Sequence, residues 1–164
     1  MKYKCENELN TFNFRDFGVM DIGFANDTFS MLTGGAIAKY DNSCNETLEE
    51  RYISDTQIRI VDCQIEKFFL EGGKYYDAND VLLSEEPDKE VEKSAYKEMF
   101  KKIKDGESTV FFVGEKSAVD ENGLKTFEIC IDITTEDTID TYWLVIKGCK
   151  IIIEFDRFMN RVMN

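Results

Sequence analysis

The side chains of this sequence that could carry chemistry are carboxylates and thiols, because the chain contains no histidine. Histidine is the commonest general base and metal ligand, so Ser–His–Asp and Cys–His nucleophilic sites cannot be built. Two carboxylate pairs share one face of an expected strand, Glu128 with Asp132 and Glu154 with Asp156. Glycoside hydrolysis requires such pairs, but among 33 acidic residues they also arise by chance on a solvated face. We therefore predict a protein that is not an enzyme and has no catalytic residue, with a carboxylate-based hydrolase or sugar-active protein as the alternative.

The thiols do not form a metal-binding or disulfide-rich pattern. Cys130 lies between Glu128 and Asp132 on the polar face of its expected strand, where adjacent anions disfavour the reactive thiolate. Cys63 and Cys149 lie in apolar runs and are expected to be small core residues. No Cys-x-x-Cys spacing suited to zinc occurs, and an odd, scattered set is unlike the framework of a small secreted domain. The prediction is reduced thiols, no metal and no cofactor. The five cysteines are Cys5, Cys44, Cys63, Cys130 and Cys149.

Two acidic loops have residue types found in calcium sites, at residues 41–45 and at residues 77–80. Neither fits the EF-hand spacing, because the positions that need glycine and the final glutamate hold other residues. Both loops are predicted to be solvated turns, with an irregular calcium site as the lesser alternative.

Four aromatic residues followed by two aspartates form the candidate interaction surface. Its members are Phe68, Phe69, Tyr75, Tyr76, Asp77 and Asp80. Packing of the aromatic rings in the core or at a sheet edge is the simpler interpretation, since apolar side chains are usually found there.

Apolar periodicity predicts the sheet. Residues 127–133 alternate apolar and polar side chains, which is typical of a strand with one solvated face. Residues 142–146 and 149–155 carry apolar side chains on both faces, which indicates two strands covered on both sides and separated at Gly148. Asn26-Asp27 predicts a tight hairpin between β-prone runs. A shift in the apolar phase near Asp62-Cys63 predicts a bulge.

One segment has helical periodicity. Val91, Ala95, Met99 and Ile103 follow one another at intervals of four, which predicts an amphipathic helix from Pro87 to Lys104, ended by Asp105-Gly106. The predicted fold is therefore mainly β, an antiparallel sandwich or partly open barrel with this helix closing one side or end. The alternative is an α+β fold with the helix packed across one face of the sheet.

Composition limits the class of protein. The 164 residues are 43% hydrophobic, which predicts a single folded domain spanning residues 1–164. There is no apolar run of membrane-spanning length and no secretory signal at the start, so we expect a cytoplasmic protein without a membrane partner.

The strong acidity of the chain points to its partners. A net charge of −13 disfavours nucleic acid and favours a basic protein partner. The predicted function is a non-enzymatic acidic binding module, and the apolar run at residues 142–146 suggests a homodimer as a further possibility. Acid excess that merely maintains solubility is the simpler interpretation.

The first seventy residues contain a series of motifs: Phe14-Arg15-Asp16-Phe17, the hydrophobic pair Met20 and Ile22, the segment from Asn26 to Met31, and Ile58-Arg59-Ile60. In these motifs the chain resembles small uncharacterised bacterial β-rich proteins. The resemblance implies a first hairpin followed by an apolar strand, and an immunity-like role, since some members are regarded as partners of secreted toxins. The chain departs from that pattern at Arg15, where histidine is common, and in the inserted helix, and the resemblance supplies no catalytic residue.

Overall fold

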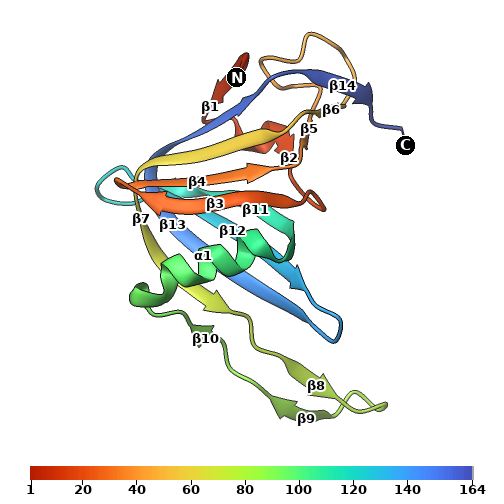
Figure 1. Ribbon diagram of the computed structural model, residues 1–164, viewed down its shortest axis with the longest axis vertical. Coiled ribbons are helices and arrows are strands. Elements are labelled where there is room, and N and C mark those ends of the chain that lie inside the picture. Colours follow the sequence, from red (N-terminus) through yellow and green to blue (C-terminus); the bar gives the residue numbers. More distant parts are fainter. Residues whose placement is uncertain (164) are drawn as a thin grey trace.

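Antiparallel strands organise most of the chain in this computed structural model, which describes residues 1–163 (Figure 1). Within these residues the main sheet has eight strands in the order β11-β12-β13-β7-β4-β3, with β1 beside β13 and β10 beside β7. They are β1 (Tyr3–Glu6), β3 (Val19–Ala25), β4 (Thr28–Thr33), β7 (Thr56–Leu70), β10 (Lys89–Glu90), β11 (Glu107–Val119), β12 (Lys125–Thr134) and β13 (Ile139–Phe155).

A smaller sheet and a separate ribbon complete the strands. The smaller sheet has the order β14-β6-β5-β2, and β8 pairs only with β9. Their bounds are β2 (Phe12–Asn13), β5 (Ala36–Ala38), β6 (Arg51–Ile53), β8 (Lys74–Tyr76), β9 (Leu82–Glu85) and β14 (Phe158–Arg161). The helical segments are η1 (Leu9–Thr11), η2 (Lys93–Ala95) and α1 (Tyr96–Asp105). The sheets are not closed into a barrel, so the prediction of a mainly β fold with one helix is confirmed.

The two longest strands, β7 and β13, bend together at Asp62 and Gly148. In β7 the buried side chains change from even to odd positions at Asp62, whose φ of 47° is left-handed. This confirms the predicted bulge near Asp62-Cys63. In β13 the same change follows Gly148, where a Cβ atom would lie 2.6 Å from Cγ2 of Ile60. The prediction of two strands separated at Gly148 is wrong, because β13 continues through the bend as one strand.

The first hairpin follows the sequence prediction. Asn26 and Asp27 join β3 to β4 with φ values of 50° and 53°. Left-handed conformations at both central residues match the right-handed twist of the flanking strands. The predicted tight hairpin is confirmed.

The helix is shorter than predicted. It begins at Tyr96 after the 3-10 turn η2, not at Pro87. Residues 89–90 instead pair with β7, and the backbone N–H of Val91 donates to the carbonyl of Phe68 at 2.8 Å. The predicted helix began too early because Val91 fits the apolar spacing of a helix. In the structure, pairing with the free edge of β7 determines the conformation of this segment instead. The helix ends at Asp105, one residue beyond the predicted Lys104, and the N–H of Gly106 donates to the carbonyl of Lys102 at 3.0 Å.

The helix α1 covers the inner side of the bent sheet, beside β3 and β11 (Figure 1). Its Phe100 and Ile103 are buried in a core cluster that extends from Cys5 to Phe155. An isolated bridge between Gly18 and Thr109 joins the segment before β3 to β11 at one point. The sheet is therefore strongly curved, and the helix fills the space between its two halves.

Candidate interaction surface

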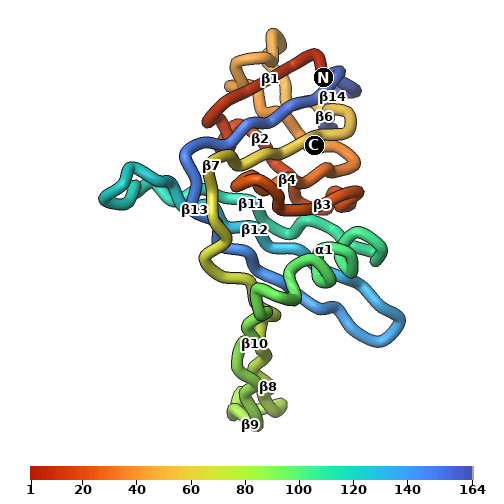
Figure 2. Tube along the Cα trace, turned by 60° about the vertical axis from the view of Figure 1, so that its left-hand side comes forward, coloured from red at the N-terminus to blue at the C-terminus, as the bar shows by residue number. Residues whose placement is uncertain are grey.

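A ribbon formed by residues 71–88, here called the arm, projects from the sheet beyond the end of β7 (Figures 1 and 2). At its base, Gly73 and Glu86 exchange backbone hydrogen bonds of 3.1 and 2.7 Å. Beside them, a Cβ atom on Gly72 would lie 2.0 Å from the carbonyl oxygen of Glu86, so this crossing requires glycine. The carboxylate of Asp88 accepts a hydrogen bond from the N–H of Gly72 at 2.8 Å. The base of the arm is therefore held by these hydrogen bonds and by the close backbone crossing at Gly72.

The tip of the arm is a turn built on two predicted surface residues. The carboxylate of Asp77 accepts hydrogen bonds from the N–H groups of Asn79 and Val81, at 2.8 and 3.0 Å. Asp80 adopts a left-handed conformation with φ of 61°. These contacts are typical of an Asx turn, as predicted for residues 77–80. Across residues 1–163, no group of three or more acidic, cysteine or histidine side chains is placed to hold a metal ion.

The arm combines negative charge with exposed apolar side chains. It carries six carboxylates and one lysine, a net of −5 within a chain of net −13. Its five large exposed apolar or aromatic residues are Tyr75, Tyr76, Val81, Leu82 and Leu83. Of these Leu83 is the most open, at 68% exposed, and the five together bring exposed apolar side chains onto one ribbon. Tyr75 and Tyr76, which the sequence predicts in an interaction surface, are thus exposed as that prediction requires.

Phe68 and Phe69 lie on opposite faces of β7. Phe68 is fully buried in the core, so its inclusion in a surface is wrong. Phe69 is half-buried and points to the outer face of the sheet, away from the core. A strand alternates its side chains between faces, so neighbouring residues cannot both belong to one patch.

Phe69 is part of an aromatic row that the sequence analysis did not identify as one surface. Register places Phe112, Cys130, Trp143 and Phe69 side by side across β11, β12, β13 and β7, and we call these four residues the outer band. Cys130 is fully buried between neighbours, while Phe112 is 43% exposed and Trp143 is half-buried. Residues 142–146 were expected to be covered on both faces of the strand. Their outer face is only partly covered.

The outer band adjoins the base of the arm. The indole Nε1 of Trp143 donates a hydrogen bond to a carboxylate oxygen of Glu71 at 3.3 Å. Band and arm therefore make one continuous surface of aromatic and acidic groups. The strand β13 itself lies between β12 and β7, so its backbone edges are already paired and a homodimer through them has no free donor or acceptor row.

The thiols that the sequence assigns to the core differ in exposure. Cys63 is buried as predicted, but Cys149 is exposed, because it continues the outward-facing odd positions of the strand before the bend, and odd positions become buried only from Ile151. Cys130 is buried, and burial first, then the charge of Asp132, raises the pKa of its thiol to about 12. It is therefore protonated at neutral pH.

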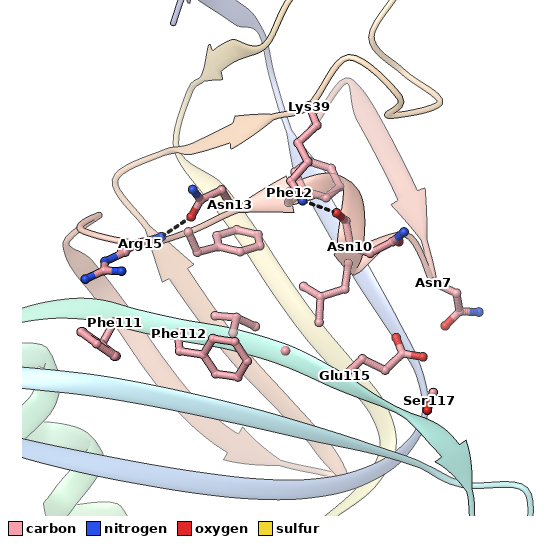
Figure 3. A pocket seen from close by; sticks show the side chains of 14 residues that line it. Asn7, Asn10, Phe12, Asn13, Arg15, Lys39, Phe111, Phe112, Glu115 and Ser117 are labelled. Atoms are coloured by element: carbon pink, nitrogen blue, oxygen red, sulfur yellow. Dashed lines mark hydrogen bonds between the residues drawn. The ribbon is translucent and has the colours of Figure 1, made fainter. Parts of the chain in front are cut away.

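A groove of about 620 Å³ lies between β11 and the segment that contains η1 and β2 (Figure 3). Asn7, Asn10 and Asn13 line one side at intervals of three residues, a spacing that could have indicated a shared surface. Beside Asn13 on the same side, Arg15 places its guanidinium 4.8 Å from the ring centre of Phe111 on β11. Sequence analysis did not identify this groove.

The charged groups around the groove have partners within the chain. The ammonium of Lys39 donates to the carbonyl of Asn10 at 2.7 Å, and Glu115, the one carboxylate among the lining residues, lies 2.8 Å from the ammonium of Lys125. Paired groups of this kind hold the walls of the groove together. The groove thus has polar walls around Phe111 and Phe112.

The sequence contains two carboxylate pairs that could have served glycoside hydrolysis. In the structure, each of the four carboxylates contacts a different partner. Glu128 lies 3.0 Å from the ammonium of Lys116, and Asp132 accepts a hydrogen bond from the hydroxyl of Thr141 at 2.7 Å. Glu154 forms an ion pair with Arg59, and Asp156 accepts a hydrogen bond from the N–H of Lys2 at 3.0 Å. The named residues of the groove do not include any of these four carboxylates.

Comparison with protein-family models, with curated proteins and with solved structures finds no match to this chain. None of the helices in residues 1–163 is long and apolar enough to cross a bilayer.

Proposed function

We propose that this protein is a non-enzymatic binding module in which the arm and the outer band together recognise a basic protein partner. The observation that carries the proposal is the arm: a projecting ribbon with a net charge of −5 and five exposed apolar or aromatic side chains. A soluble chain rarely maintains an exposed apolar cluster of this kind unless a partner covers it. An immunity-like role against a basic toxin is one form of this function.

The two chemical components have separate roles. Negative charge on the arm, which supplies −5 of the chain's net −13, attracts a cationic partner and raises the association rate. Tyr75, Tyr76 and Leu83 supply apolar contact area, which chiefly sets how slowly the complex dissociates. Added salt should therefore slow association, because it screens the charges. It should leave the dissociation rate largely unchanged.

The construction of the arm suits this role. Its base is fixed by the crossing at Gly72 and by the pair of hydrogen bonds between Gly73 and Glu86. Beyond the base, β8 and β9 pair only with each other, and a two-stranded ribbon is marginally stable in water. Contact with a partner would bury the apolar side chains of the ribbon and stabilise it.

Affinity capture from the native host with four forms of the full chain, the wild type, two arm variants and one control variant, tests the proposal. The first form is the wild type, and the second is Leu82→Ser with Leu83→Ser. The third combines Glu85→Gln with Glu86→Gln, and its matched control combines Glu46→Gln with Glu50→Gln. The control has the same net charge of −11, but its changes lie on the exposed connection before β6.

Quantitative mass spectrometry should find one or more proteins of high isoelectric point that the wild type and the control retain and both arm variants lose. Association with that protein should slow by about tenfold or more between 50 and 500 mM salt. Equal capture by all forms, or an association rate independent of salt, would show that the arm does not recognise a basic partner.

A further inference from the structure

Two thiols from distant parts of the chain meet beside the smaller sheet. Cys5 lies in β1 and Cys44 in the connection between β5 and β6, 39 positions later. Their sulfur atoms are 3.2 Å apart, within contact distance, and both cysteines are free. A disulfide bond is about 2.05 Å long, so about 1 Å of approach would join them.

We propose that Cys5 and Cys44 are a covalent modification site, at which a peroxide converts the two thiols into one intramolecular disulfide. In the first step the sulfur of Cys44 attacks hydrogen peroxide, the O–O bond breaks, and the products are a sulfenic acid and one water molecule. In the second step the sulfur of Cys5 attacks the sulfur of that sulfenic acid. The S–O bond breaks, the S–S bond forms, and a second water molecule carries away the oxygen and the thiol proton.

Exposure assigns the order of the two steps. Cys5 is 1% exposed, whereas Cys44 is partly exposed and accessible to a small oxidant. Burial first, then the hydrogen bond with Cys44, raises the pKa of the Cys5 thiol to about 12. Cys44 therefore reacts with the peroxide, and Cys5 resolves the sulfenic acid slowly because its thiolate is scarce at neutral pH.

The surroundings hold the pair in position. Asn42 is 3% exposed, and its side-chain oxygen accepts the backbone N–H of Cys44 at 3.0 Å. Its amide nitrogen donates to the hydroxyl of Thr11 at 2.8 Å and lies 3.7 Å from the sulfur of Cys5. On the next residue, the hydroxyl of Ser43 donates to the carboxylate of Glu8 at 2.7 Å. The connection is thus bound to the N-terminal segment on both sides of the sulfur pair.

The cross-link would tie β1, an added strand beside β13, to the long connection before β6. Closing a loop of this length restricts the unfolded chain more than the folded one. The oxidised protein should therefore be more stable than the reduced protein without a change of fold.

Peptide mapping of the peroxide-treated full chain tests the site directly. Trypsin cleavage after Lys4, Arg15, Lys39 and Arg51 places the two cysteines on separate peptides, residues 5–15 and 40–51, each with one thiol. The folded protein should yield these peptides joined and two hydrogens lighter than their sum, and dithiothreitol should separate them. The midpoint of thermal unfolding should rise by about 5–10 °C on oxidation.

Variants distinguish this pair from the other thiols. Cys44→Ser should abolish both the cross-link and the thermal shift, and Cys5→Ala provides a second variant if one of them folds poorly. Cys149→Ser, which removes the exposed thiol of β13, should leave both effects intact. Recovery of Cys44 as a sulfenic or sulfinic acid with Cys5 unmodified, or joining of other cysteines in its place, would overturn the proposal.

Discussion

The ring of Phe100 in α1 stacks on the ring of Phe68 in β7, with centroids 5.6 Å apart and planes inclined by 20°. Phe68 is fully buried and also contacts the rings of Tyr96 and Tyr142. The helix therefore joins the sheet through an aromatic cluster at the point where β7 leaves the core for the arm. This arrangement explains why a short helix is sufficient to close the concave side.

Replacing Phe100 with alanine should therefore destabilise the whole fold. Removal of a buried phenylalanine leaves a cavity against Phe68, and we expect a loss of about 3 kcal/mol in the free energy of unfolding. Urea denaturation followed by circular dichroism measures this change. Tyr76→Ala, which removes an exposed ring of the arm, should change the same quantity by about 0.5 kcal/mol or less. Equal effects of the two variants would contradict the role of the aromatic cluster.

Gly148→Ala should destabilise the bend shared by β7 and β13. The added methyl group would meet Cγ2 of Ile60 at 2.6 Å and Cβ of Cys63 at 2.8 Å, which forces both strands to shift. We expect a loss of about 1–3 kcal/mol in the free energy of unfolding, measured in urea. Gly23→Ala in β3 is the matched control, because a methyl group there meets nothing within 4 Å. A neutral result at Gly148 would mean that the bend relaxes without strain.

The sequence predicted those elements in which local pattern and tertiary contacts agree. Alternation at residues 127–133 and the turn at Asn26-Asp27 both specify strand geometry directly, and the strand and the turn are both confirmed, although Cys130 on the expected solvated face is fully buried. The phase shift at Asp62 was visible because a reversal of faces moves buried residues from even to odd positions. In β13 the buried side chains likewise change from even to odd positions beyond Gly148. Glycine also marks turns, so the sequence pattern predicts the end of a strand there.

The remaining errors come from pairing between distant segments. Val91 fits the apolar stripe of the helix, but its N–H pairs with Phe68 in the sheet, a contact that local periodicity cannot reveal. Similarly, the outer band depends on the register of four strands, so Phe112 and Trp143 become neighbours only once β11, β12 and β13 are aligned. The sequence predicts a turn at residues 77–80 and exposed aromatic residues beside it, but the projection of the arm from the sheet is a property of the tertiary structure.

Asp120→Asn should alter the pH dependence of stability. The N–H of Leu124 first, then the N–H of Asn122 and the ammonium of Lys147, hold the pKa of Asp120 below its ordinary value of 3.8. A lowered pKa in the folded state gives stability that is present at neutral pH and is lost as the pH falls from 3.8 through the folded pKa. The variant should be less stable than the wild type at pH 7, and the difference should shrink towards pH 2.5. Urea denaturation at several pH values checks this, with Asp137→Asn in the exposed turn before β13 as control.

Truncation of the arm should separate folding from recognition. Gly73 and Glu86 already pair through two backbone hydrogen bonds, so Asn-Gly in place of residues 74–85 would close a two-residue hairpin between them. Because β8 and β9 pair only with each other, the midpoint of thermal unfolding should change by about 3 °C or less.

The same truncation should abolish binding of the basic partner identified by affinity capture. The deletion removes three carboxylates and one lysine and leaves a net charge of −11, the same as the combined Glu46→Gln and Glu50→Gln variant. That variant should retain binding, so a difference between the two isolates the arm from the overall charge. If the truncated chain binds as tightly as the full chain, recognition lies elsewhere, and if it fails to fold, the arm is part of the core rather than an appended element.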